Sequence, residues 1–393
     1  MSVSTTLVAT EPTVQAASLQ TVGSSSSRLL SLDVFRGATI AAMMLVNNAG
    51  NWNAVYPPLR HSAWHGWTFT DTIFPFFLWI AGVSMTFSFA KRLERNDSRT
   101  RLLTHTLQRA ATIFLLGLFL NLFPLFQFST VRIPGVLQRI AVCYLIAGVI
   151  FLYTSLRGQM VWTASLLLVY CALMKLVPVP GFGVGILEKE GNFAQYVDQL
   201  VLSGHMWASS KTWDPEGIVS TLPAIATILF GVLTGHLLRS RLTPENKTAW
   251  LMVMGNCLIG VGLVWAWWLP INKPLWTSSY SLFMAGMAAN VFGCCYWLLD
   301  IKGYRRWSQP LAIYGMNAIT VYVLAGLLSK LSSFIKVAGV DGSEITAGKW
   351  VYEHIYAPLA SPVNASLLYA LTYVAILYGV SWFMYRMKWF VRV

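Results

Sequence analysis

Ten apolar runs recur along this chain, and they constrain its fold more than any other feature. The runs lie near residues 30–49, 70–90, 104–123, 137–154, 159–177, 217–238, 249–269, 276–299, 309–329 and 366–386. At about 20 residues, each run is long enough to cross the hydrocarbon core of a bilayer as a helix. Only 11% of the 393 residues are charged, whereas soluble domains carry about 25%. We therefore predict an all-α, polytopic membrane protein with about ten transmembrane helices.

The connections between the runs differ in charge, and this difference predicts how the chain crosses the membrane. Basic residues crowd the connection 91–103 and recur in alternate connections after it. Cytoplasmic loops of membrane proteins are enriched in Lys and Arg, so we expect both termini in the cytoplasm and loops 50–69, 178–216 and 330–365 on the exoplasmic side. The net charge of +13 has the same explanation. The chain offers no compact basic face of the kind that would indicate nucleic-acid binding.

The N-terminal segment differs in composition from the rest of the chain. Residues 1–28 are rich in Ser, Thr, Ala and Val and nearly uncharged, with no basic stretch ahead of an apolar one. That pattern does not match a cleaved signal peptide. We expect a disordered cytoplasmic tail, followed by one membrane domain over residues 29–393.

A short polar and aromatic segment, residues 59–71, separates the first two apolar runs. It holds His61, His65 and Asp71. Imidazole titrates near neutral pH, so His61 is a candidate general base. Asp71 either orients His61 or caps the second helix. A histidine pair four residues apart suggests metal, but no third ligand accompanies it and no cysteine has metal-ligand spacing, so we expect no metal.

Polar residues in or beside the spans are the next candidates, because such groups are costly in a bilayer and are often functional. Arg36 lies three residues after Asp33 and either pairs with it or faces an anion at a cytoplasmic mouth. Asn47 either caps the first span or donates to an oxyanion. Arg132 and Arg139 flank a Pro-Gly turn, as interfacial anchors or as ligands of an anionic group. A further group, Asn317, falls well inside the ninth run and needs a partner there.

These pieces, together with others in the same order, resemble the heparan-alpha-glucosaminide N-acetyltransferase family, a branch of the transmembrane acyltransferases. The matching segments are Ser31 to Gly37, Val46-Asn47, His61 to Gly66, Asp71 to Pro75, Val131 to Arg139, Pro178 to Gly181, Asp214 to Ile218, Asn272-Lys273, Leu275-Trp276 and Gly315 to Asn317. The most specific of them is the run Val131 to Arg139. One departure is His65, which stands where the family usually has Asn.

The resemblance implies a reaction and assigns roles to residues. It implies transfer of an acetyl group from acetyl-CoA to the amine of a terminal glucosamine, across the bilayer, by an acyltransferase domain over residues 29–393. His61 matches the catalytic histidine and Asn47 the asparagine beside it. We add Asp71 to the catalytic group from its position at the start of the second span. We expect the donor to bind Arg36, Arg132, Arg139 and Asn317, and the amino-sugar or glycan acceptor to bind Trp64, Asp214, Glu216, Asn272 and Lys273.

Three further expectations follow from the resemblance. The short form suggests a multi-pass protein of a bacterial inner membrane, and the family suggests a homodimer. His61 acts either as a general base or as a covalent acetyl carrier.

The alternative function is a secondary transporter or exporter of a small anion or sugar, which ten spans and a midplane asparagine would suit.

Overall fold

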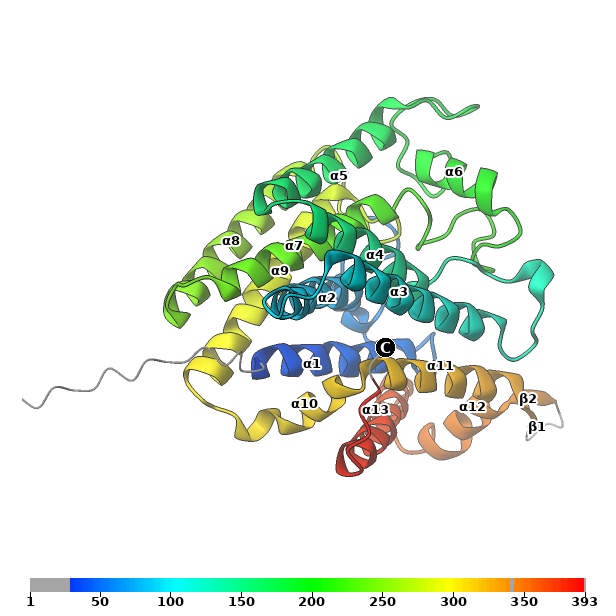
Figure 1. The fold of residues 1–393 in the computed structure, drawn as a ribbon. Coiled ribbons are helices and arrows are strands. Elements are labelled where there is room, and N and C mark those ends of the chain that lie inside the picture. The colour runs from blue at the N-terminus through cyan, green and yellow to red at the C-terminus, as the bar shows by residue number, and fades with distance from the viewer. Residues whose placement is uncertain (1–28, 340–342, 392–393) are drawn as a thin grey trace, which may run out of the picture.

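The computed structural model describes residues 29–339 and 343–391, and it consists almost entirely of helices (Figure 1). The tail expected over residues 1–28 lies outside the described residues. The long helices are α1 (Leu30–Asn47), α2 (Phe69–Leu93), α3 (Arg99–Leu122), α4 (Val136–Tyr153), α5 (Leu156–Leu176), α7 (Thr221–Arg239), α8 (Pro244–Trp265), α9 (Ser278–Tyr296), α10 (Gln309–Met316), α11 (Ala318–Phe334) and α13 (Pro362–Arg386). Short elements complete the fold: helices α6 (Phe193–Leu202) and α12 (Ala347–Val351), and an antiparallel pair of strands, β1 (Lys336–Ala338) and β2 (Glu344–Thr346).

Nine of the described helices are long and apolar enough to cross a membrane, and a tenth span is possible as a bent pair. The predicted spans match these helices to within a few residues, with one correction. The run 309–329 is not one straight helix: it is broken into α10 and α11, which meet at an angle of 69°. The break falls at Asn317, whose backbone leaves the helical region at φ −120° and ψ 37°. Hydropathy alone does not distinguish a straight apolar helix from one that bends in the middle.

The bundle is held together by close helix pairs, of which α2 with α7 is an example. Gly82 of α2 and Gly231 of α7 each lie against the backbone of the partner helix, and a Cβ at either position would overlap it. Without a Cβ the two backbones approach closely, which is how helices associate where water provides no driving force. α2 is thereby fixed in the middle of the bundle, and its first turn carries Asp71.

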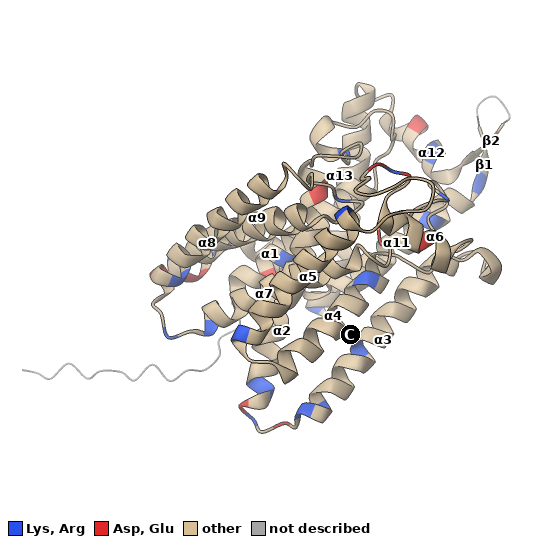
Figure 2. Cartoon of the chain, turned by 90° about the horizontal axis from the view of Figure 1, so that it is seen from above, with Lys and Arg blue, Asp and Glu red and all other residues tan. Residues whose placement is uncertain are grey.

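The basic residues gather in particular connections, as Figure 2 shows for the loops that join α2 to α3 and α7 to α8. Arg92, in the last turn of α2, pairs with Asp97 of the first loop at 3.0 Å. Arg239, the last residue of α7, reaches Glu94 in the first loop at 2.5 Å. The two loops therefore lie at the same end of the bundle, in agreement with the charge pattern of the sequence. Which compartment that end faces stays a prediction.

Candidate active site

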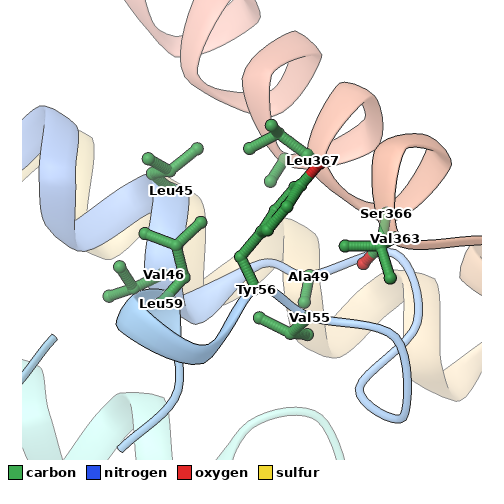
Figure 3. A pocket seen from close by; sticks show the side chains of 10 residues that line it. Leu45, Val46, Ala49, Val55, Tyr56, Leu59, Val363, Ser366 and Leu367 are labelled. Atoms are coloured by element: carbon green, nitrogen blue, oxygen red, sulfur yellow. The ribbon is translucent and has the colours of Figure 1, made fainter. Parts of the chain in front are cut away.

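The loop that carries His61 is packed against the last helix of the chain. Residues 49–59 leave α1, turn through a short 3-10 helix at Pro57–Leu59 and return towards α2. Figure 3 shows Tyr56 and Val55 from this loop beside Leu367 and Val363 of α13. Tyr56 also donates a hydrogen bond of 2.5 Å to Asn364. α13 therefore supports the loop from outside, although it is almost the whole chain away in sequence.

Asp71 joins the start of α2 to His61. Its Oδ2 accepts hydrogen bonds from the backbone N–H groups of Ser62 and Thr68 at 3.0 Å each, and with Thr68 it forms a capping box. Its Oδ1 lies 2.7 Å from Nδ1 of His61. Both roles weighed for Asp71 are thus present in one buried side chain. With the proton on Nδ1, the lone pair is on Nε2, as a base requires.

Lys273 is the second titratable neighbour of His61. Its Nζ lies 3.0 Å from His61 Nδ1 and 3.5 Å from Asp71 Oδ1. A tight turn presents it: Asn272 Oδ1 accepts from the Leu275 N–H, and Trp276 adopts φ 49°, in the left-handed region. Burial lowers the pKa of Lys273, and the negative charges of Asp71 and Glu216 oppose that shift.

A small cavity of about 130 Å³ opens beside this cluster. His61, Lys273 and Glu216 contribute ionisable groups to its wall, and Asn47 at the end of α1 faces the same space. Among the described residues, none hydrogen-bonds to the Asn47 side chain, so its amide is available to a molecule in the cavity. The remaining wall is mostly apolar and includes Tyr322 of α11.

A larger cavity of about 510 Å³ lies in the opposite half of the same helices. Arg36 of α1 and Arg109 of α3 line it, and Arg36 donates to Ser84 Oγ at 2.7 Å. Arg109 lies over the ring of Tyr144, 4.8 Å from its centroid, and its buried Nε has no hydrogen-bond partner in the described part of the chain. Asp33 also lines this cavity and pairs with Arg36 at 3.3 Å. The guanidinium of Arg109, with its unsatisfied donor, is therefore the better fit for an anionic ligand such as a phosphate.

The two cavities approach each other along α2 and α11. On α2, Phe77 lines the larger cavity and Phe74 lines the smaller one. On α11, Ile319 lines the larger cavity and Tyr322 lines the smaller one. Three residues of helix correspond to a rise of about 4.5 Å. The arginine-lined space and the His61 space are therefore separated by about one helical turn, within one bundle.

Comparison with known proteins assigns the family. A family profile described as heparan-alpha-glucosaminide N-acetyltransferase, catalytic, matches residues 28–264, more than half of the chain. The chain belongs to this family. Heparan-alpha-glucosaminide N-acetyltransferase from Mus musculus is 30% identical over 360 residues, covering 77% of this chain and 54% of the mouse protein. The Homo sapiens protein of the same name is 31% identical over 354 residues, covering 75% and 52%. The chain thus spans about half the length of these relatives.

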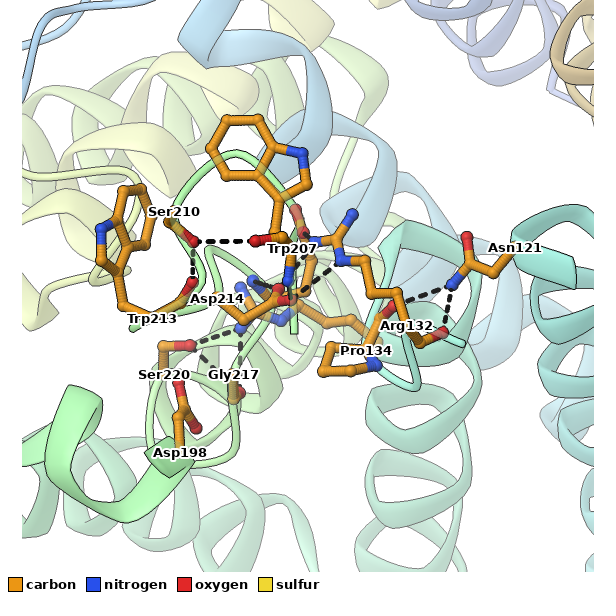
Figure 4. A network of polar contacts seen from close by, with 12 residues as sticks. Asn121, Arg132, Pro134, Asp198, Trp207, Ser210, Trp213, Asp214, Gly217 and Ser220 are labelled. Atoms are coloured by element: carbon orange, nitrogen blue, oxygen red, sulfur yellow. Dashed lines mark hydrogen bonds and ion pairs between the residues drawn. The ribbon is translucent and has the colours of Figure 1, made fainter. Parts of the chain in front are cut away.

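The family motif around Arg132 forms a network with the motif around Asp214 (Figure 4). Arg132 donates from Nε and Nη2 to both oxygens of Asp214, at 2.8 and 2.6 Å, and also pairs with Glu216. Burial opposes the charged form of Arg132, but the paired carboxylates raise its pKa above the ordinary value. Arg132 and Asp214 therefore satisfy one another and clamp two loops together. Donor binding by Arg132 and acceptor binding by Asp214 stay predictions, whereas Glu216 does reach the His61 cavity.

Arg139 and Asn317, two expected donor ligands, are engaged within the protein. Arg139 is buried, donates to the Gly217 carbonyl and to Ser220, and lies over the ring of Trp276. It lines neither of the two cavities. Asn317 binds the end of the chain: its Nδ2 donates to the Trp389 carbonyl at 3.2 Å and its Oδ1 accepts from the Val391 N–H at 3.1 Å. Binding of acetyl-CoA by Arg139 and Asn317 stays a prediction.

The expected acceptor ligands Trp64 and Asn272 serve packing. Trp64 is buried against Trp213, and its indole N–H donates to the Leu187 carbonyl at 2.9 Å. Asn272 is fully buried, and its Nδ2 lies 3.3 Å from Nδ1 of His65. His65, the departure from the family pattern, thus ties the His61 loop to the Lys273 turn. Acceptor binding by Trp64 and Asn272 stays a prediction.

Sequence reasoning missed Arg109 and its neighbours Tyr144 and Ser84. A signal was present, since Arg109 is an arginine inside the predicted span 104–123, and ionisable groups in spans are often functional. Ser84 and Tyr144 carry no such signal. Among the described residues, no group of three or more His, Cys, Asp or Glu side chains is placed to hold a metal ion.

Proposed function

We propose that this chain is a membrane N-acetyltransferase that moves the acetyl group of cytoplasmic acetyl-CoA to the amine of a glucosamine-type sugar on the exoplasmic side. The observation that carries the proposal is the placement of the two cavities. One holds Arg36 and Arg109, which suit the phosphates of a nucleotide; the other holds His61, and about one helical turn separates them. Family membership supports the same reaction.

The donor is long and charged at one end, which suits this arrangement. Phosphates would bind Arg36 and Arg109 near the basic loops, and the thioester arm would extend towards His61. Asn47 follows Arg36 by 11 positions on α1, a rise of about 16 Å. The arm, and not the charged nucleotide, would cross the middle of the membrane, where burying phosphates would cost most.

His61 performs the proton transfer in this proposal. Its Nε2 takes a proton from the acceptor amine as the nitrogen attacks the thioester carbonyl, and Asp71 stabilises the resulting imidazolium through Nδ1. The new C–N bond forms, the C–S bond breaks, and the proton passes to the leaving thiolate. The side-chain amide of Asn47 donates to the carbonyl oxygen while it carries negative charge. In the variant route, His61 Nε2 itself takes the acetyl group before the amine arrives.

Purified protein in liposomes tests the function. Acetyl-CoA is supplied on one side and glucosamine on the other, and free thiol is measured. We expect thiol release that depends on glucosamine, and His61→Ala should lower the rate by about 10²- to 10⁴-fold. His354→Ala, at an exposed histidine of the helical segment Tyr352–Tyr356 that lines neither cavity, is the matched control. Sugar flux without thiol release would instead establish a transporter and overturn the proposal.

The location and assembly are proposals of the same kind. The helices make this a multi-pass membrane protein, and we place it in a cell inner membrane because acetyl-CoA is cytoplasmic. The homodimer stays a prediction.

A further inference from the structure

A third cavity lies between α5 and α8 and has a volume of about 710 Å³. α5 and α8 hardly touch each other, whereas α7 and α9 pack together beneath them and form the floor. We call this cavity the α5–α8 slot. Its deepest residues include Trp79 of α2 and Ala285 of α9, both buried in the bundle. The slot is therefore an indentation in the body of the protein and not a gap between surface side chains.

The slot has the proportions of a lipid chain. On α8 it is lined from Trp250 through Met254, Leu258 and Val261 to Trp265. These positions recur every three or four residues, so they form one face of the helix. From Trp250 to Trp265 the rise is about 22 Å, against a hydrocarbon core of about 30 Å. A straight apolar chain running along α8 would fill the slot.

The polar residues of the slot gather at one end. Apart from Thr163, they are Thr234, His236 and Ser240, all from the last turns of α7. His236 is held in place by Gln159, whose Oε1 lies 2.9 Å from its Nε2. The other end of the slot, towards Trp265 and Leu282, is apolar. One polar end and a long apolar channel match the division of a phospholipid into head group and chain.

Three basic residues lie close to lining residues in the sequence. Arg157 follows the lining residue Leu156, Arg241 follows Ser240, and Lys247 precedes Trp250 by three positions on the same face of α8. None of these three has an ion-pair partner in the part of the chain that the structure describes; of the acidic residues nearby, Glu94 pairs with Arg239, and Glu245 lies two positions before Lys247. Each Lys or Arg near an anionic membrane surface contributes favourably to binding an anionic lipid.

We propose that the α5–α8 slot binds one anionic glycerophospholipid, with an acyl chain along α8 and its phosphate among Arg157, Arg241 and Lys247. Charge complementarity selects this occupant over a zwitterionic lipid. The polar residues at one end and the apolar length along α8 favour a lipid chain over a helix of a second copy. This site shares no lining residue with either of the cavities at the reaction site.

Native mass spectrometry of the full chain tests the site, with phosphatidylglycerol and phosphatidylcholine of identical chains as the probes. We expect one phosphatidylglycerol to be retained per chain. Ala164→Trp, which fills the slot, should abolish retention, and Val169→Trp, at an exposed position of α5 outside the slot, should not. Arg241→Gln with Lys247→Gln should lower the preference for phosphatidylglycerol by about 30-fold, at about 1 kcal/mol for each charge.

The matched charge control is Lys91→Gln with Arg99→Gln, which removes two positive charges from the helix ends that flank the α2–α3 loop. It should leave the preference unchanged. Equal lipid retention by Ala164→Trp and Val169→Trp would identify the lipid as unspecific and overturn the proposal. A dimer that Ala164→Trp dissociates would also overturn it, because a second copy would then occupy the slot.

Discussion

Asp71 Oδ1 lies 2.7 Å from His61 Nδ1, and the same carboxylate closes the capping box at the start of α2. Because Asp71 both caps the start of α2 and orients the candidate base, it couples the position of His61 to the body of the bundle. The ring of His61 is half-exposed, whereas Asp71 is fully buried. The buried carboxylate thus holds one side of the exposed ring, as preorganisation of a base requires.

Asp71→Asn should lower the rate of acetyl transfer by about 10²-fold or more, because the amide cannot stabilise an imidazolium and permits the wrong tautomer. The double variant with His61→Ala should be no slower than His61→Ala alone, since the two residues act as a unit. Thiol release from acetyl-CoA measures both. Asp97→Asn, in the α2–α3 loop, is the control for loss of a carboxylate, and additive effects of the double variant would contradict the coupling.

Arg109→Met should raise the KM for acetyl-CoA by about 10- to 100-fold, the effect of losing one charged hydrogen bond. The larger cavity would keep Arg36 but lose the guanidinium with the unsatisfied Nε. Arg101→Met is the matched control, because Arg101 lies on the same helix with its side chain 74% exposed. Acetyl-pantetheine, which has no nucleotide, should react equally well with wild type and Arg109→Met. A loss with both donors would place Arg109 outside nucleotide binding.

Arg132→Met should lower the free energy of unfolding by about 3–5 kcal/mol, because it leaves the buried carboxylate of Asp214 without its partner. Thermal unfolding in detergent measures the loss. Removing Arg101 from its exposed pair with Asp97 should cost less than about 1 kcal/mol. If Arg132 instead serves mainly to bind the donor, Arg132→Met would raise the KM for acetyl-CoA with little change in stability.

Asp198, on α6 in the loop 178–216, should make stability depend on pH. Burial raises the pKa of Asp198 to about 6, helped by the charge of Asp214 and opposed by the Ile218 N–H. A carboxyl whose pKa is higher in the folded than in the unfolded state stabilises the fold below pH about 4, and this contribution is lost as the pH rises through 6. The loss is about 3 kcal/mol. Unfolding between pH 4 and 7 should show it, and Asp198→Asn should remove it.

The spans and the reactive segment were largely predictable from the sequence. Apolar length and charge bias act locally and additively, so they placed nine continuous helices to within a few residues, and they isolated the loop with His61, His65 and Asp71. The bond between His61 and Asp71 was foreseen as one of two roles, because ten residues and a helix start bring the two side chains together.

Long-range contacts were decided only by the tertiary structure. Lys273 comes within 3.0 Å of His61 across 212 positions, and Arg132 finds Asp214 across 82. Asn317, at the break, binds the end of the chain 74 positions away, and the role of Arg109 is apparent only from the cavity it lines. Hydropathy reports the free-energy cost of placing a residue in lipid. It does not report which distant residue offsets that cost. The sequence thus determined the membrane helices and the candidate base, and packing chose the partners that surround it.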